Sequence, residues 1–242
     1  MDYQDVLAEV GAGSAHPGGM QSTRIWMEAL NIEPMSRVLE VGCGTGRTLL
    51  ELERKFGCSI TGVDIRSVMV QKARRRAKEM GQTAQFITAN VEALPFPDGE
   101  FDVIVSESVH VFCDPAVSLS ECHRVLCPGG QMVDVEMVVL EPVTEAWRRD
   151  VQSTYGVRQV PDLAGWKRLY GGAGFQKVQT LTMRRVVPDQ AMVAEQQDLD
   201  PVDLSSKGAY QKAQVLSTLE ANAKWLERNH HSMGYAIFLL EA

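Results

Sequence analysis

A short apolar run, three closely spaced glycines and a helical pattern follow one another early in the chain, and together they leave few folds open. The run occupies residues 37–41, and Gly42, Gly44 and Gly46 come directly after it. Apolar residues in 48–56 then recur at three- and four-residue spacing, as in an amphipathic helix. Glycine lets a backbone turn sharply and lets a ligand approach closely. The pattern predicts a strand, a turn that binds a nucleotide-like cofactor, and a helix.

The same alternation of strand and helix patterns continues along the chain. It is typical of a parallel sheet covered by helices on both faces, which makes the fold class α/β. The predicted strands are 37–41, 59–63, 84–88, 101–106, 129–138, 175–182 and 234–240. The predicted helices between them are 48–56, 67–80, 115–126 and a segment within 165–174.

Two segments fall outside this alternation. Residues 1–36 are expected to form N-terminal cap helices, with a helix at 24–30 capped by Ser22 or Thr23 after the turn at 16–19. Residues 37–242 form the main domain, which carries a helical insertion at about 183–233. So long a connection between neighbouring strands indicates a functional or assembly element, such as a homodimer contact. Its clearest helix is 207–229, and its predicted apolar stripe is Ala209, Ala213, Leu216, Leu219, Ala223 and Leu226. The alternative is a helix that only packs on the same core.

Composition limits the partners. The chain has 31 Asp and Glu residues against 24 Lys and Arg residues, a net charge of −7. Because a nucleic-acid backbone is bound by clustered Lys and Arg, this balance argues against a nucleic-acid partner. No apolar run reaches the roughly 20 residues of a membrane span, and the first ten residues are acidic rather than signal-like. We therefore expect a cytoplasmic protein with no membrane partner.

We predict no chemistry for the one basic run or for the cysteines. The run lies in the pattern of the 67–80 helix and is interpreted as a solvated helix face. It consists of Lys72, Arg74, Arg75, Arg76 and Lys78. The cysteines form no C-x-x-C pair and no zinc-ligand spacing, so we expect reduced thiols and no metal site. They are Cys43, Cys58, Cys113, Cys122 and Cys127.

The glycine spacing separates two cofactor classes. A dinucleotide fingerprint, G-x-G-x-x-G, would need a glycine where this chain has Arg47, so a nicotinamide-dependent oxidoreductase is a weak alternative. The pattern Glu40-x-Gly42-x-Gly44-x-Gly46 instead resembles motif I of class I S-adenosylmethionine-dependent methyltransferases. Asp64 ends the next predicted strand, where a carboxylate can accept hydrogen bonds from both ribose hydroxyls, although it could simply cap a helix.

Two later segments extend the resemblance. Residues 89–102 are similar to the ubiquinone-biosynthesis-like, or type 11, branch of that family, with Asn90 where the family has an acid. Residues 124–130 resemble the turn that opens its fifth strand. The resemblance covers roughly 16–138. It implies a Rossmann-like doubly wound sheet of seven strands, mostly parallel with an antiparallel last strand.

The resemblance also implies a set of cofactor-binding residues for S-adenosylmethionine. Glu40, Gly42, Cys43, Gly44 and Gly46 would line the methionine and sugar side, and Asp64 would bind the ribose. Ile65 would lie on the adenine face, Asn90 and Val91 at the adenine edge, and the backbone of Ser106 beside the methionine amine. The Asn90 side-chain oxygen can still accept a hydrogen bond from the adenine amine.

The expected reaction is in-line methyl transfer to a small-molecule acceptor, for which alignment alone supplies much of the catalysis. A base is optional, and Glu107 with His110 are the catalytic candidates, one helical turn apart on one face. A histidine there can instead be a hydrogen-bonded helix-start residue. Glu136 is also expected near the carboxyl ends of the strands. It is either a further candidate acid of the site or simply an exposed residue at the end of a strand.

The acceptor side has further candidates. His16 is either part of a cap over the site or a turn residue. Four aromatic residues are either an acceptor lid or core: Trp147, Tyr155, Trp166 and Tyr170. The alternative to an enzyme is a non-catalytic S-adenosylmethionine-binding partner or regulatory subunit, which the Asn90 departure and the insertion would also fit.

Overall fold

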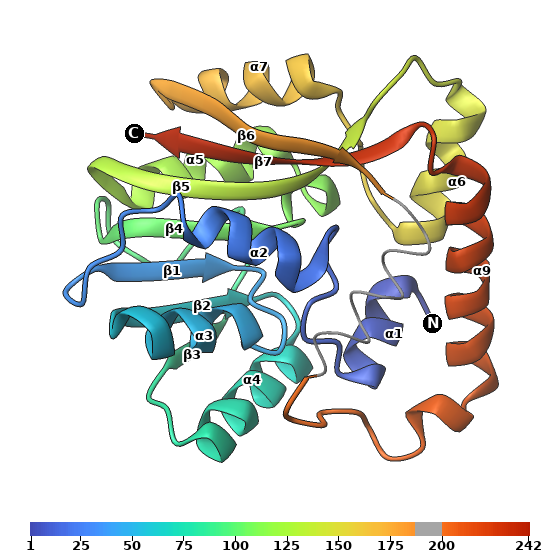
Figure 1. Ribbon diagram of the computed structural model, residues 1–242, viewed down its shortest axis with the longest axis horizontal. Coiled ribbons are helices and arrows are strands. Elements are labelled where there is room, and N and C mark those ends of the chain that lie inside the picture. Colours follow the sequence, from blue (N-terminus) through green and yellow to red (C-terminus); the bar gives the residue numbers. More distant parts are fainter. Residues whose placement is uncertain (187–199) are drawn as a thin grey trace.

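A seven-stranded sheet organises the computed structural model, which describes residues 1–186 and 200–242 (Figure 1). The strand order is β3-β2-β1-β4-β5-β7-β6. The strands are β1 (Arg37–Val41), β2 (Ser59–Asp64), β3 (Gln85–Thr88), β4 (Phe101–Glu107), β5 (Leu126–Val139), β6 (Lys177–Arg185) and β7 (Met233–Glu241). Strands β1 to β5 pair in parallel, and β7 runs antiparallel to both neighbours. The expected fold class is confirmed.

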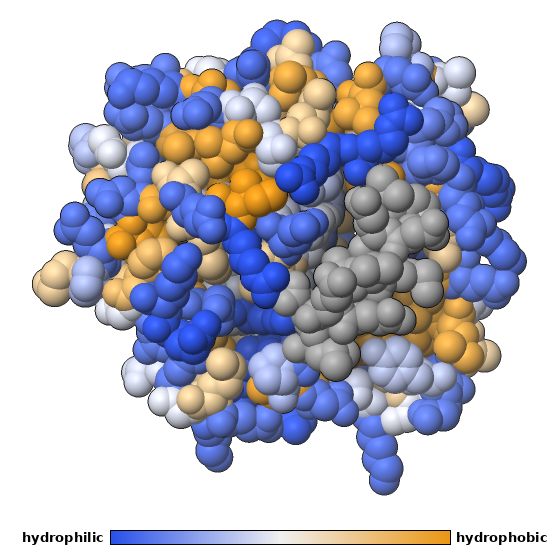
Figure 2. Space-filling view, in the orientation of Figure 1, coloured by the Kyte–Doolittle hydropathy of each residue, from blue (hydrophilic) through white to orange (hydrophobic). Residues whose placement is uncertain are grey.

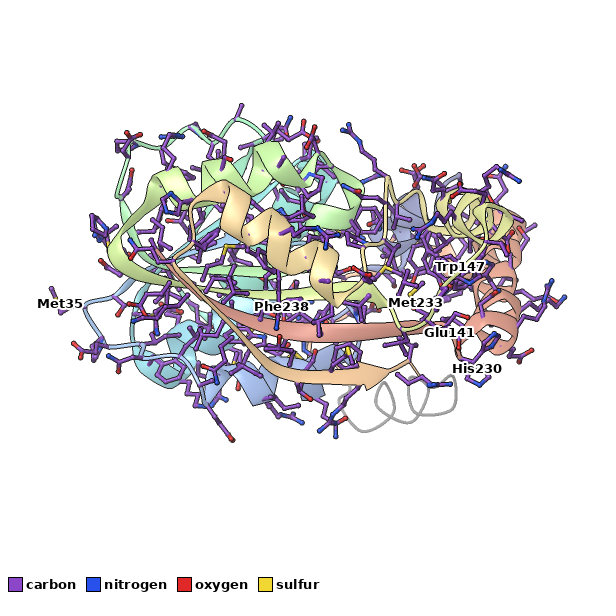
Figure 3. The ribbon with its side chains drawn as sticks, turned by 90° about the horizontal axis from the view of Figure 1, so that it is seen from above. Met35, Glu141, Trp147, His230, Met233 and Phe238 are labelled. Carbon is purple, nitrogen blue, oxygen red and sulfur yellow. The ribbon has the colours of Figure 1, made fainter. Side chains whose placement is uncertain are left out.

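Helices cover both faces of this sheet (Figures 1 and 3). One face packs against α2 (Gly19–Met27), α3 (Arg47–Phe56) and α4 (Ser67–Met80), through buried residues such as Trp26 and Leu49. The other packs against α5 (Pro115–Val125) and α7 (Leu163–Ala173), through Leu119 and Trp166. Because both faces are covered, the central strands are mainly apolar, which explains why their positions could be predicted from the sequence.

Helix boundaries follow local capping chemistry. The N-terminus of α5 is set by Asp114, whose Oδ1 accepts the Ala116 backbone N–H at 3.0 Å, and by Pro115 in the first turn. Gly81, at φ 66°, ends α4. The basic run on α4 is not wholly a solvated face, contrary to the sequence interpretation, because the Arg76 side chain is 1% exposed.

The N-terminal region begins with α1 (Tyr3–Val10) and continues through a loop to α2. The predicted start of the second helix was wrong: Gly18, at φ 82°, precedes the first turn, so Ser22 and Thr23 lie inside the helix. A serine or threonine inside a helix is free to bond elsewhere. Both of these hydroxyls turn toward His16.

The connection between β6 and β7 contains η2 (Ala209–Gln211) and α9 (Ala213–Asn229). The predicted apolar stripe was wrong in part: Ala209 is buried and Leu226 packs against the core, but Ala213 and Ala223 are exposed. Val215 and Trp225 are buried, whereas Leu216 is 51% exposed. At the right of Figure 2, where α9 lies, the visible surface is mainly hydrophilic.

The aromatic residues divide between two environments. Trp166 and Tyr170 are fully buried in the core under α7, which favours the core alternative over a lid. Trp147 and Tyr155 belong to α6 (Glu145–Tyr155) and pack against Trp225 of α9, with ring centroids 5.6 and 5.3 Å apart. Figure 3 shows Trp147 beside α9, far from Phe238 in the sheet. None of the helices in the described ranges has the length and apolar character needed to cross a membrane.

Candidate active site

The turn between β1 and α3 has the backbone that the glycine pattern predicts. Gly42, Gly44 and Gly46 have φ values of 65°, 50° and 75°, in the left-handed region that favours glycine. A Cβ built at Gly44 would meet no described atom within 4 Å. The space in front of Gly44 is therefore open to a ligand, and any side chain at this position would fill it.

Asp64 ties the end of β2 to this turn. Its Oδ2 accepts the Gly44 backbone N–H at 2.9 Å, and its Oδ1 accepts the Arg66 N–H at 2.8 Å. Burial raises the pKa of Asp64. Each carboxylate oxygen has a second lone pair, so the group can still accept from ligand hydroxyls.

Acidic side chains gather around the turn. Glu40, at the end of β1, is 4% exposed, and its Oε2 has no hydrogen-bond partner among the described residues. Burial, together with the charges of Glu107 and Asp64, raises the pKa of Glu40 well above its usual range. A buried orphan acceptor beside two further carboxyl groups is suited to a cationic ligand with hydrogen-bond donors. S-adenosylmethionine, which carries a sulfonium and an ammonium group, fits this setting.

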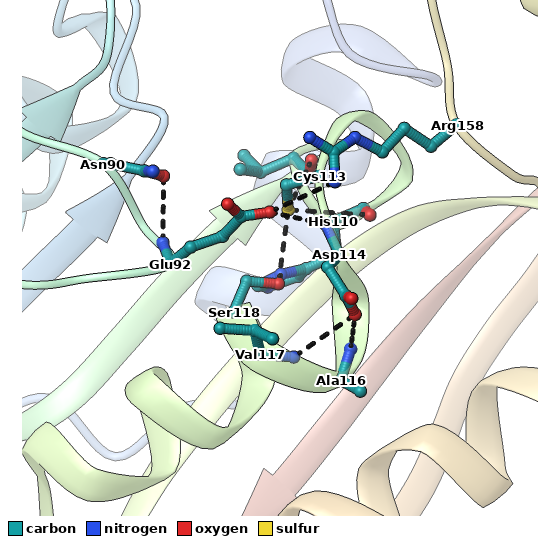
Figure 4. A network of polar contacts seen from close by, with 10 residues as sticks. Asn90, Glu92, His110, Cys113, Asp114, Ala116, Val117, Ser118 and Arg158 are labelled. Carbon is teal, nitrogen blue, oxygen red and sulfur yellow. Dashed lines mark hydrogen bonds and ion pairs between the residues drawn. The ribbon is translucent and has the colours of Figure 1, made fainter.

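The residues expected around adenine lie at the neighbouring strand ends. Ile65 is 67% exposed, which leaves an apolar side chain free for a ring face, and Val91 is 8% exposed. Asn90 is exposed, and its Oδ1 accepts the Glu92 backbone N–H at 3.0 Å (Figure 4). The Asn90 amide oxygen therefore already stabilises the local turn of residues 90–92.

Two other expected cofactor residues present backbone rather than side chains. Cys43 is 5% exposed, its N–H donates to Val63 O at 2.9 Å, and burial raises the pKa of its thiol. Ser106 has no exposed surface and pairs with Val41 on one side and Asp134 on the other. A role for either residue toward a ligand would pass through its main chain.

Glu107, the last residue of β4, lies at the centre of a buried polar network. Its Oε1 accepts the Thr23 hydroxyl at 2.7 Å and the Trp26 indole N–H at 2.8 Å. Its Oε2 accepts the Thr48 hydroxyl at 2.8 Å and lies 3.3 Å from His16 Nε2. Both the His16 and Glu107 side chains are nearly buried, at 6% and 5% exposure.

The hydrogen-bond geometry assigns the proton on His16. The Thr23 hydroxyl directs its single proton to Glu107, so it can only accept from His16 Nε2, 3.3 Å away. Nε2 therefore carries hydrogen. Nδ1 lies 3.3 Å from the Ser22 hydroxyl, whose own proton is directed to the carbonyl oxygens of Pro17 and Gly19 at 3.0 and 2.8 Å. His16 thus contacts Ser22 and Thr23 of α2 and Glu107 at the end of β4.

His110 does not join Glu107, so the expected shared face was wrong. It lies in the short helix η1 (His110–Phe112), has no exposed surface, and its Nδ1 is 2.7 Å from the Ser118 hydroxyl of α5 (Figure 4). Burial lowers the pKa of His110 to about 3. The physical reason is the turn after β4: Ser108 adopts φ 62°, and the chain then carries His110 to the other face of the sheet.

Glu136 holds that turn. Its Oε1 accepts the N–H groups of Val109 and His110 at 2.9 and 2.6 Å, and the residue has no exposed surface. The expectation that Glu136 reaches the rim was therefore wrong. Burial and the charge of Asp134 raise the pKa of Glu136.

Some residues of the site were not selected from the sequence. Thr23, Trp26 and Thr48 all bond Glu107, and only the spacing of Thr23 and Trp26 on one helix face carries a signal. Their partner lies more than fifty residues away in sequence, where no local pattern points to it.

Comparisons with known proteins agree with this geometry. A family model described as "Methyltransferase domain" matches residues 38–130. The chain is 27% identical over 237 residues to an uncharacterized methyltransferase, YodH, of Bacillus subtilis, covering 98% of this chain and 97% of the relative. It is 40% identical over 102 residues to demethylmenaquinone methyltransferase of Thermus thermophilus, covering 41% and 46%.

A solved structure extends the likeness over the whole fold. The [4+2]-cyclase SpnF superposes with a TM-score of 0.74 at 24% sequence identity, covering 98% of this chain and 91% of that chain. The acid-lined glycine turn, the strand order and the matched domain lead to one assignment. Residues 38–130 of this chain match the methyltransferase domain, and the whole chain resembles the class I S-adenosylmethionine-dependent methyltransferases in sequence and strand order.

Proposed function

We propose that this protein transfers the methyl group of S-adenosylmethionine to a small-molecule acceptor by in-line displacement. The observation that carries the proposal is the open glycine turn fixed by Asp64 beside the buried, unpartnered Glu40. The net charge of −7 supports an acceptor other than a nucleic acid. The Thermus thermophilus relative is named for a small-molecule substrate, demethylmenaquinone, which supports the same class.

We assign the cofactor contacts as follows. The turn from Glu40 to Gly46, including Gly42, Cys43 and Gly44, would hold the methionine and sugar side, and Asp64 the ribose hydroxyls. The exposed Ile65 would cover the adenine face, with Asn90 and Val91 at its edge and the Ser106 main chain beside the amine. When bound, S-adenosylmethionine supplies a methyl group that its sulfonium already activates. The protein's part is to align the acceptor and exclude water.

We further propose that His16 is the acid–base residue for acceptors that must lose a proton, with Glu107 as its positioning residue. The Nε2–H of His16 faces Glu107, so a proton exchanged with an acceptor would pass through Nδ1, which lies 3.3 Å from the Ser22 hydroxyl. The Glu107 carboxylate would then stabilise the charged ring, as the acid does in hydrolase triads. This pair replaces the Glu107 and His110 pair suggested by sequence.

A substitution tests the acid–base role. For His16→Gln we expect methyl transfer to fall about a hundredfold, within the range of general acid–base catalysis, with S-adenosylhomocysteine affinity unchanged. The exposed His231→Gln is the matched control, with 54% of its side chain accessible. Turnover with His16→Gln equal to wild type would remove His16 from the chemistry.

The proposed reaction itself is tested with labelled cofactor. Protein incubated with methyl-labelled S-adenosylmethionine and a metabolite extract should yield a labelled small molecule, and heat-treated protein should not. Tight S-adenosylhomocysteine binding with no labelled product from any extract would favour the alternative, a non-catalytic binding partner or regulatory subunit. A homodimer through the 183–233 insertion stays a prediction, which light scattering checks.

A further inference from the structure

One arginine of the basic run on α4 is buried against the cofactor turn. Arg76 Nε donates to the carbonyl oxygen of Thr45 at 2.9 Å, and its Nη2 donates to the Thr45 hydroxyl at 3.0 Å. Thr45 lies between Gly44 and Gly46 in the turn. The guanidinium therefore donates hydrogen bonds to both the carbonyl oxygen and the hydroxyl of Thr45.

The same guanidinium is neutralised by a residue from the insertion. Both Nη atoms donate to the Asp200 carboxylate, Nη2 at 2.7 Å, across 124 residues of sequence. Asp200 Oδ1 also accepts the Val202 backbone N–H at 3.0 Å, which fixes its orientation. Because a buried charge is costly unless paired, Arg76 depends on Asp200 to remain against Thr45.

Residues 200–206 also lie against the N-terminal region. The Ser206 N–H donates to Glu9 O at 2.7 Å, and Lys72 of α4 donates to Leu204 O. A Cβ at Gly13 would lie 2.3 Å from Asp200 Oδ2, so the packing there is close. The Thr45 hydroxyl donates in turn to Ala12 O at 3.2 Å. Three segments distant in sequence thus converge on Thr45.

We propose that Arg76, anchored by Asp200, is a positioning residue of the cofactor site, and that affinity for S-adenosylmethionine depends on residues 200–206 through it. The inference rests on the proposed function, because the turn is taken as the cofactor site. Fixing Thr45 fixes the two flanking glycines, whose φ values of 50° and 75° shape the open space. The coupling is reciprocal: a cofactor that stabilises the turn also stabilises residues 200–206.

The first test compares a variant of Asp200 with a variant of its partner Arg76 on α4. Asp200→Asn keeps the size and the Oδ1 acceptor for Val202 but removes the charge that pairs Arg76. We expect calorimetric titration to show S-adenosylhomocysteine binding about tenfold weaker, within the usual range of coupling between sites. Arg76→Lys keeps the charge but loses the planar fork, and should weaken binding in the same direction.

The control variant is Arg75→Gln, on the adjacent position of α4. Arg75 is 58% exposed and pairs with Glu79 at 2.7 Å, so its loss should leave cofactor affinity within about twofold of wild type. Circular dichroism and melting temperature establish that each apo variant is folded. The comparison therefore separates an effect on the turn from a general loss of structure.

Hydrogen–deuterium exchange tests the coupling itself. S-adenosylhomocysteine should slow exchange in the peptide covering 200–206 of the wild type, and Asp200→Asn should speed exchange in the apo peptide covering 43–50. If Asp200 stabilises only the insertion, Asp200→Asn will leave exchange in the 43–50 peptide unchanged. If Asp200→Asn and Arg76→Lys both bind S-adenosylhomocysteine as tightly as the wild type does, this inference alone is overturned. Absence of binding to the wild type overturns the proposed function as well.

Discussion

Asp64 has a double task, because the carboxylate that would meet the ribose also holds the turn through Gly44. Replacement with alanine removes both contributions. We expect Asp64→Ala to weaken S-adenosylhomocysteine binding about a hundredfold, equivalent to one or two charge-assisted hydrogen bonds. Calorimetry measures this against Asp98→Ala, an acid whose side chain is 80% exposed. Equal loss in both variants would show that only net charge matters.

His110 offers a pH-dependent test, because burial lowers its pKa to about 3 from an ordinary 6.5. Below pH 6.5 the unfolded chain takes up a proton on this ring that the folded protein cannot, so folded stability declines as pH falls toward 3. The decline is about 1.4 kcal/mol per pH unit. Asn at this position keeps a partner for Ser118 without titrating.

Urea unfolding at two pH values isolates that effect. Relative to His110→Asn, wild type should lose about 2 kcal/mol more unfolding free energy between pH 7 and pH 5. Other groups titrate in both proteins and cancel in the difference. Parallel pH profiles would mean that His110 takes up its proton in the folded state.

At the scale of the secondary-structure elements, α2 makes two side-chain hydrogen bonds to one buried acid of the sheet. Thr23 and Trp26 of α2 and Thr48 of α3 all donate to Glu107 on β4. The helix is therefore held over the strand ends by hydrogen bonds as well as by apolar packing. Any acceptor that needs this region to open must break them.

Glu107→Gln tests that attachment. The amide replaces one acceptor oxygen with a donor, which leaves a buried donor unpaired at a cost of about 1–3 kcal/mol. We expect a loss of that size in urea unfolding and faster amide exchange in α2. Glu220→Gln, which breaks only the exposed pair with Lys224, should change neither. Unaltered exchange in α2 would show that apolar packing alone holds it.

Elements with strong periodicity were predictable, and those fixed by distant partners were not. The five parallel strands and the helices between them followed from local apolar spacing, since both sheet faces are covered. The start of α2 was missed because Gly18 begins the helix in a left-handed conformation, which no side chain announces. The buried side of α9 depends on Tyr155 and Trp147 of another helix, so its own sequence favoured a stripe that is wrong in part.

At the scale of the whole molecule, the cofactor turn is the meeting point of the sheet, the N-terminal region and the insertion. The glycine turn followed from the sequence because it is local to β1 and α3, and Asp64, which contacts it, ends the adjacent strand. Arg76 was misread as a solvated residue, since its partner Asp200 lies 124 residues away. His16 and Glu107 show the same limit: the sequence paired Glu107 with His110, and only the fold brings His16 to Glu107.

The central claim is that this acid-lined turn binds the adenosyl sulfonium donor. Titration of the purified protein with S-adenosylhomocysteine by isothermal calorimetry tests it most directly, with NAD as the comparison ligand. We expect saturable binding of S-adenosylhomocysteine at one site per chain and no heat from NAD. No binding of S-adenosylhomocysteine, or preferential binding of NAD, would contradict it.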